Sequence, residues 1–95
     1  PKTIAVLPFA NLSLNAENEY FSDGLTAELI HVLTRLPRLR VVAWPSAAHW
    51  KNRKRDMKEI IGELQADVVL EGTVRWARER VRVTVQLIDT ETSLY

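Results

Sequence analysis

The sequence predicts a mixed α/β fold (α+β, one mixed sheet) with the element order β-α-β-α-β-β, in which the first strand is central. Three observations support this prediction. Thr3–Pro8 is an almost wholly apolar run, typical of a strand covered on both faces. Two stretches with helical spacing of apolar residues follow, and two further segments then alternate apolar and polar residues. Right-handed crossovers would place the helices on opposite faces of the sheet and leave a C-terminal antiparallel hairpin.

The first helix is preceded by a polar, turn-prone stretch, Asn11–Asn18, which is predicted as a loop. Ser22 or Asp23 could cap a helix that starts near Gly24, although the pattern permits a start as early as Tyr20. The apolar residues of this helix recur at three- and four-residue steps: Phe21, Leu25, Leu29, Val32, Leu33 and Leu36.

Pro37 ends this helix, and Leu39–Trp44 is predicted as the second strand, which the next proline stops. Ser46–Arg55 is compatible with either a helical turn or a loop. A second helix is predicted over Asp56–Gln65, with Asp56 as its N-cap. Its apolar residues lie on one helical stripe: Met57, Ile60, Ile61 and Leu64.

The two C-terminal segments, Val68–Trp76 and Arg80–Ile88, both alternate with a period of two. A reversal around Arg78-Glu79 places apolar residues opposite one another: Trp76 with Val81, Val74 with Val83, Gly72 with Val85, and Leu70 with Leu87. A slip of one residue would oppose apolar to polar positions throughout, so the register is well specified, with the apolar face inside. Arg78 and Glu79 are poor residues for a tight primed turn, so we favour the longer loop Ala77–Arg80.

Composition narrows the class of protein. The hydrophobic fraction of 46% and the charged fraction of 26% are those of an ordinary globular domain. The absence of cysteine excludes disulfides and thiol chemistry. No apolar run approaches the ~20 residues needed to cross a bilayer, so no direct membrane insertion is predicted. Composition leaves the compartment open, cytoplasmic or periplasmic, and residues 1–95 are predicted to form one domain of a larger multidomain protein.

The sequence offers no set of side chains suited to catalysis. His31 and His49 are the two histidines, and Ser46, three residues before His49, has neither an acid nearby nor the glycines of a nucleophile elbow. Glu59 and Glu63 are one helical turn apart but have no histidine companion, which favours two solvated charges over a metal site. The glycines form no phosphate-binding loop. The sequence therefore predicts a domain that is not an enzyme and has no cofactor or metal.

Two groups of side chains are candidate partner-binding sites. The first is the basic segment and its tryptophan: Trp50, Lys51, Arg53, Lys54 and Arg55. It could bind an acidic protein, bind nucleic acid or simply offset the acidic first helix, and a net charge of only +1 makes nucleic acid the weakest of these. Trp50 could be exposed there or buried as an anchor. The second group is Arg75 and Arg82, with Arg80 beside them. Arg75 and Arg82 would be directly opposed in the hairpin, which is unfavourable unless a negative group lies on them, and that group could simply be Glu71 or Glu79.

These residues resemble a known family, the TolB amino-terminal-like domain, which is related to the curli-assembly (CsgG-like) group. Leu39–Ser46 matches the family loosely. The stretches that carry the resemblance are Ile4–Ser13, Glu19–Ile30, Val68–Arg75 and Arg80–Asp89. In bacteria such domains often precede tetratricopeptide repeats in adenylate cyclases and in CadC-like transcriptional regulators.

The resemblance implies a mixed-sheet fold and a role as a sensor or protein-interaction module in signal transduction, with cell-envelope assembly as the alternative. The partner would be another protein or a neighbouring domain of the same chain, in a parent that could be membrane-anchored. The family has glycine where this chain has Arg78, and it continues with a strand where Thr90–Tyr95 stops. The last strand is therefore predicted to be incomplete, which would leave a sheet edge able to pair with a second copy.

Overall fold

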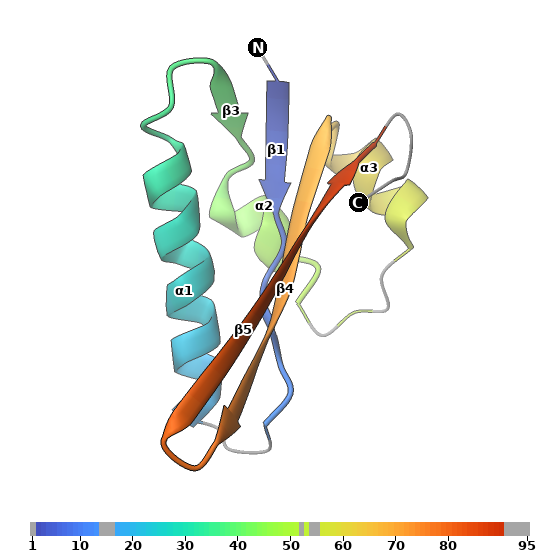
Figure 1. Ribbon diagram of the computed structural model, residues 1–95. Coiled ribbons are helices and arrows are strands. Elements are labelled where there is room, and N and C mark those ends of the chain that lie inside the picture. The colour runs from blue at the N-terminus through green and yellow to red at the C-terminus, as the bar shows by residue number, and fades with distance from the viewer. Residues whose placement is uncertain (1, 14–16, 52, 54–55, 91–95) are drawn as a thin grey trace.

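The computed structural model describes residues 2–13, 17–51, 53 and 56–90. Along the chain the elements are β1 (Lys2–Val6), β2 (Ala10–Asn11), α1 (Glu17–Leu33), β3 (Leu39–Val41), α2 (Trp44–Ala48), α3 (Met57–Leu64), β4 (Val68–Ala77) and β5 (Arg80–Asp89) (Figure 1). β1 lies between β3 and β4 and is parallel to both, and β5 extends the sheet antiparallel to β4. The predicted mixed sheet with a central first strand is confirmed.

β1 and β2 together form one interrupted strand along β4. They pair with it in these registers: Val6 with Leu70, and Ala10 with Thr73. Three residues (7–9) thus lie opposite two residues of β4 (71–72). The extra residue between β1 and β2 makes this a β-bulge. The loop predicted at Asn11–Asn18 therefore begins too early, because Asn11 still pairs with β4. Pro8 lies within the bulge, where the missing N–H of proline is tolerated.

α1 begins at Glu17, well before the start predicted near Gly24. Ser22 and Asp23 are inside the helix and do not cap it. Glu17 and Glu19 lie in the first turn, where carboxylates favour the positive end of the helix dipole. The predicted start is too late because it rests on the spacing of apolar residues, and the first turn of α1 is polar.

The inner face of α1 also differs from the predicted one. Ser22 and Thr26 are its most buried side chains, and Phe21, Val32 and Leu36 are exposed. The side chains that pack inward are Ser22, Leu25, Thr26, Leu29, Ile30 and Leu33. The Thr26 hydroxyl accepts a hydrogen bond from the backbone N–H of Phe9 (3.0 Å) and donates one to the Ser22 carbonyl (2.9 Å). These bonds satisfy the backbone of the bulge, which is why polar residues lie on this buried face.

In the middle of the chain, the strand is shorter than predicted and there is an additional short helix. β3 ends at Val41, so the strand predicted to reach Trp44 is too long, and Trp44 instead opens α2 with a proline in its first turn. The second predicted helix is confirmed as α3. Its N-cap is Asp56, whose carboxylate accepts a hydrogen bond from the N–H of Lys58 (3.0 Å). It closes at Gln65 in the left-handed conformation, with φ of 51°.

The hairpin has the predicted register over its full length, from Leu70 opposite Leu87 to Trp76 opposite Val81. The predicted four-residue loop is wrong, because Ala77 pairs with Arg80 and the turn is the two-residue one. Arg78 takes a positive φ of 57°, the conformation that usually favours glycine. Ten paired positions on each strand outweigh the ~1–3 kcal/mol that such a conformation costs a residue with a side chain.

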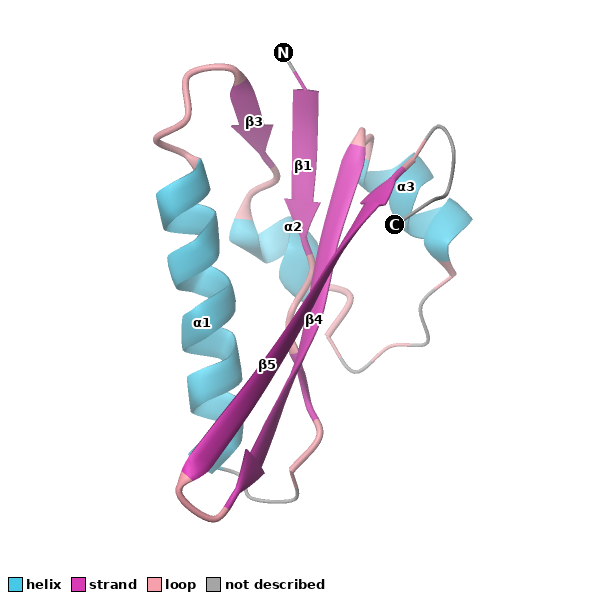
Figure 2. Cartoon of the chain, viewed as in Figure 1, coloured by secondary structure: helices cyan, strands magenta, loops and turns pink. Residues whose placement is uncertain are grey.

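Two cores lie on opposite faces of the sheet, as Figure 2 shows from the placement of α1 and α3. The core under α1 contains Ile4, Val6, Phe9, Leu70 and Val74. The core under α2 and α3 contains Ala5, Leu7, Trp50, Ile60, Ala66, Val69 and Ile88. Successive residues of β1 therefore alternate between the cores, as the continuous apolar run predicted.

The apolar row of β5 is not inside, which corrects the prediction for that strand. Val81, Val83, Val85 and Leu87 are each 41–50% exposed. α1 packs on β1, β2, β3 and β4, and the row of β5 extends beyond the part of the sheet that this helix covers.

Candidate interaction surface

The basic segment after α2 is partly engaged within the domain. The Lys51 ammonium forms ion pairs with Asp23 (2.5 Å) and with Glu19 (3.2 Å), both on α1. The hydrogen bond to Asp23 and, less strongly, that to Glu19 raise the pKa of Lys51 above its usual value, although partial burial opposes them. This is the predicted alternative in which the segment offsets the acidic helix. Arg53 is exposed, and Lys54 and Arg55 lie outside the described residues.

The sequence left open whether Trp50 is exposed or is a buried anchor, and the structure shows that it is buried. Its side chain is 3% exposed and packs among the residues of the α3-side core. The ring also makes an edge-on contact with His49, with centroids 5.5 Å apart. The indole N–H is buried, and no group in the described part of the chain accepts a hydrogen bond from it. Trp50 therefore holds the connection to the sheet and cannot present its ring to a partner.

We expect Lys51→Met to lower the free energy of unfolding by about 0.5–1 kcal/mol at low salt, because two partly exposed ion pairs are lost. The folded-state pKa of Lys51 is raised, so this stabilisation is complete below about pH 10.5 and declines as pH rises through the raised value. Urea titrations at low and high salt, and at pH 7 and 11, would measure it. Arg53→Met is the matched control and should change little. Equal stability of the two variants at pH 7 would contradict the expectation.

The polar face of the hairpin carries the second candidate group. Arg75 and Arg82 are directly opposed and both exposed, with Arg80 next to them at the hairpin tip. Within the described residues, no carboxylate forms an ion pair with these three guanidinium groups. Opposed like charges are destabilising in a sheet. The predicted pair is thus brought together and left open, whereas Lys51 is engaged and Trp50 is buried.

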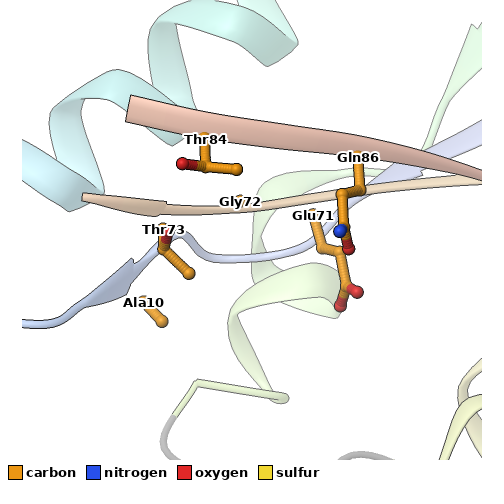
Figure 3. Close-up of a pocket in the computed structure, with 6 residues that line it drawn as sticks. All are labelled: Ala10, Glu71, Gly72, Thr73, Thr84 and Gln86. Carbon is orange, nitrogen blue, oxygen red and sulfur yellow. The ribbon is translucent and has the colours of Figure 1, made fainter. Parts of the chain in front are cut away.

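A shallow pocket lies on the same face, between β2 and the hairpin. Figure 3 shows its lining: Ala10, Glu71, Gly72, Thr73, Thr84 and Gln86. Glu71 and Gln86 project from adjacent strands, and the threonines contribute hydroxyl groups. Among the described residues no group of three or more His, Cys, Asp or Glu side chains could hold a metal ion. This pocket offers the hydrogen-bonding groups of Glu71, Thr73, Thr84 and Gln86.

None of the helices in the described part of the chain is both long and apolar enough to cross a membrane.

Comparison with known families gives one match over nearly the whole chain. The model of the second domain of HilA/YgeH-like transcriptional regulators matches residues 1–94. A curated protein of Rhizobium meliloti (strain 1021), named "Putative adenylate cyclase 3", is 41% identical over 90 residues. That alignment covers 95% of this chain and 15% of the Rhizobium protein, so the chain spans a small part of its relative's length.

Solved structures share the fold at low sequence identity. Lipoprotein GNA1162 from Neisseria meningitidis has a TM-score of 0.70 at 19% identity, covering 98% of this chain and 73% of that one. LpoB from E. coli has a TM-score of 0.70 at 14% identity, covering 97% and 51%. The PelC dodecamer from Paraburkholderia phytofirmans has a TM-score of 0.57 at 21% identity, covering 98% and 64%. These similarities agree with the family resemblance found in the sequence.

Proposed function

Because this chain belongs to the family of the second domain of HilA/YgeH-like transcriptional regulators, we propose that it is a non-catalytic protein-interaction module of a bacterial signalling protein. The observation that carries the proposal is that Arg75 and Arg82 lie opposite each other on the exposed face of the hairpin, with neither of them ion-paired to a carboxylate of the described residues. The relative named as an adenylate cyclase supports a signalling parent. The catalytic or DNA-binding work would belong to other parts of that parent, with tetratricopeptide repeats as a neighbouring element.

The partner of this face would be an acidic surface on another protein or on a neighbouring domain of the same chain. Arginine suits such a contact because its planar fork binds carboxylates through two hydrogen bonds. A carboxylate placed between Arg75 and Arg82 would also remove the repulsion between them, so binding would relieve a cost that the free domain carries.

The test is the double charge reversal Arg75→Glu with Arg82→Glu in the full-length parent. We expect affinity for the partner or neighbouring domain to fall about tenfold or more, since two charge-assisted contacts become repulsive. The parent's output, measured as cyclic AMP or reporter transcription, should change with it. Arg38→Glu with Arg40→Glu is the matched control: it alters the net charge equally, at exposed positions beside the opposite edge of the sheet. A folded hairpin variant with normal output would contradict the proposal.

A second candidate function is cell-envelope assembly, which the fold similarity to lipoprotein GNA1162 and to the PelC dodecamer favours. In that case the domain would act on the periplasmic side, with self-association through the C-terminal edge strand as part of its role. Protease accessibility of the domain in spheroplasts would separate the two functions, because a cytoplasmic signalling module would stay protected. Nucleic-acid binding through residues 51–55 is the weakest hypothesis, since Lys51 is already held by two carboxylates.

A further inference from the structure

Two pairs of facing side chains lie next to each other on the polar face of the hairpin. Thr73 on β4 faces Thr84 on β5, and we call these residues the threonine pair. Arg75 faces Arg82 one step closer to the turn, and these residues are the arginine pair. Thr73 is half-buried and the other three are exposed. Facing residues are ~5 Å apart and successive residues on one face ~7 Å apart, so the four side chains surround one spot.

These four side chains line a single cavity of about 140 Å³. β4 forms its floor and β5 forms one wall. The opposite wall is Leu12, which follows β2 and donates its N–H to the Val74 carbonyl of β4 (2.8 Å). Because β4 has a described strand on each side, the floor and these two walls are formed by described residues.

The cavity is lined by hydrogen-bond donors that have no partner within the described part of the chain. No hydrogen bond or ion pair among the described residues engages the side chains of the arginine pair or the threonine pair. A guanidinium group binds an oxyanion through two N–H groups, and a hydroxyl group donates one hydrogen bond. The described lining residues include no carboxylate. The cavity is therefore suited to an anion with several oxygen atoms.

The charge of the site favours a phosphate group over a carboxylate. The arginine pair carries two positive charges. A phosphomonoester carries about −1.5 to −2 near pH 7 and has three strong acceptor oxygens. A carboxylate has one negative charge and two oxygens. A phosphomonoester therefore neutralises both arginines, leaves an oxygen for the threonine pair, and removes the repulsion between the facing guanidinium groups.

A second cavity, of about 200 Å³, adjoins the first and shares the threonine pair with it (Figure 3). Beyond the threonine pair it is lined by Glu71 and Gln86, whose side chains can bind hydroxyl groups. This polar strip ends there, because the next residues on the same face, Val69 and Ile88, are buried in the α3-side core. The strip from the arginine pair to Glu71 spans four residues of strand, about 14 Å, which is the length of a small molecule.

We propose that the arginine pair and the threonine pair bind the phosphate group of a small phosphorylated metabolite, whose hydroxylated body lies toward Glu71 and Gln86. The bound phosphate neutralises the arginine pair, which is also the contact for the acidic partner in the proposed function. The metabolite therefore competes with that partner. This competition would make the interaction module a sensor, and in this respect the inference rests on the proposed function.

Amide chemical shifts of the ¹⁵N-labelled chain test the ligand, with methyl phosphate, glucose 6-phosphate and acetate titrated in a phosphate-free buffer of low ionic strength. We expect both phosphate esters to shift the amides of Thr73 and Thr84, and glucose 6-phosphate alone to shift that of Gln86. Acetate should bind about tenfold more weakly, because it balances one of the two charges. Acetate that binds as tightly as methyl phosphate, or amides that none of the three ligands shifts, would overturn the proposal.

Two double variants identify the groups that hold the phosphate. Thr73→Val with Thr84→Val removes both hydroxyl groups and keeps the β-branched shape and the charge. We expect it to bind glucose 6-phosphate about tenfold more weakly. Glutamine at both positions of the arginine pair should weaken binding at least as much, whereas Arg38→Gln with Arg40→Gln removes the same charge at exposed positions elsewhere and should bind normally. Unchanged binding by the valine variant, or equal losses in the two arginine variants, would contradict the site.

A phosphoserine residue in a glycine-flanked peptide presents the same chemical group from a protein. Tighter binding of this peptide than of glucose 6-phosphate would overturn the proposed small molecule in favour of a phosphorylated protein.

The valine variant also separates this inference from the proposed function. It keeps the arginine pair, so its affinity for the acidic partner should be unchanged while its affinity for glucose 6-phosphate falls. Absence of glucose 6-phosphate binding together with an intact effect of the charge reversal would remove the metabolite and leave the proposed function standing. Binding of glucose 6-phosphate without any effect of the charge reversal on the parent would remove the proposed function and leave the phosphate site.

Discussion

Gly72→Ala is expected to lower the free energy of unfolding by about 3 kcal/mol, a large share of the ~5–15 kcal/mol typical of a small domain. Gly72 lies in β4 opposite the bulge, where the Phe9 ring lies against its Cα. A methyl group there would come within 2.5 Å of the Phe9 ring and within 2.5 Å of the Thr84 carbonyl oxygen. Because the second contact is backbone of the paired strand, rotation of Phe9 cannot relieve it. Urea unfolding followed by circular dichroism would measure the loss.

Two other glycines provide controls for this substitution. Gly24 in α1 and Gly62 in α3 have no neighbouring atom within 4 Å of an added Cβ. Gly24→Ala and Gly62→Ala should therefore stabilise the protein, each by up to ~1 kcal/mol, because alanine is the better helix former. Phe9→Leu combined with Gly72→Ala should recover part of the lost stability, since the ring contact is relieved and the carbonyl contact stays. Wild-type stability of Gly72→Ala would show that the ring does not rest on this strand.

Trp50→Ala is expected to cost about 3–5 kcal/mol and to leave little folded protein, because it empties the centre of the α3-side core. The same substitution tests whether Trp50 is an anchor or a contact residue. A partner-binding tryptophan would leave the stability of the free domain unchanged when truncated. Thermal and urea unfolding of the isolated chain would therefore decide the role without knowledge of the partner.

Trp50→Phe is the conservative variant for this experiment, and Tyr20→Ala is its control at an exposed aromatic residue. The buried indole N–H has no hydrogen-bond acceptor within the described residues, so phenylalanine loses volume but no hydrogen bond, and we expect a smaller cost of ~1–2 kcal/mol. Tyr20 is 81% exposed, and its truncation should change stability by less than ~0.5 kcal/mol. A Trp50→Ala variant as stable as Tyr20→Ala would contradict the placement of Trp50 in the core.

The candidate site was predictable only in part. The opposition of Arg75 and Arg82 follows from the period of two and one register, and the structure has that register. Whether a cation is free or engaged depends on which carboxylates lie near it across the fold. Lys51 meets Asp23 and Glu19, residues far away along the chain, because the connection after α2 packs beside the first turns of α1. Spacing along the chain carries no signal for such a contact.

By itself, the sequence determined the elements whose evidence is local. The register of the hairpin follows from alternation along two adjacent segments, and the start of α3 follows from Asp56 and the stripe behind it. Both are short-range consequences of backbone geometry, so they could be predicted residue by residue.

Only the tertiary structure decided what covers each face. The bulge at residues 7–9, the buried hydroxyls of Ser22 and Thr26 and the open row of β5 all depend on where α1 crosses the sheet. A helix satisfies the hydrogen bonds of its own backbone, but the N–H of Phe9 in the bulge needs a partner from outside its strand. The Thr26 hydroxyl is that partner, which is why a polar residue interrupts the apolar periodicity of α1. The same crossing leaves Val81, Val83, Val85 and Leu87 half exposed, because α1 packs on the other four strands of a five-stranded sheet. Apolar alternation predicts which residues share a face, and the reach of the neighbouring helix decides whether that face is core or surface.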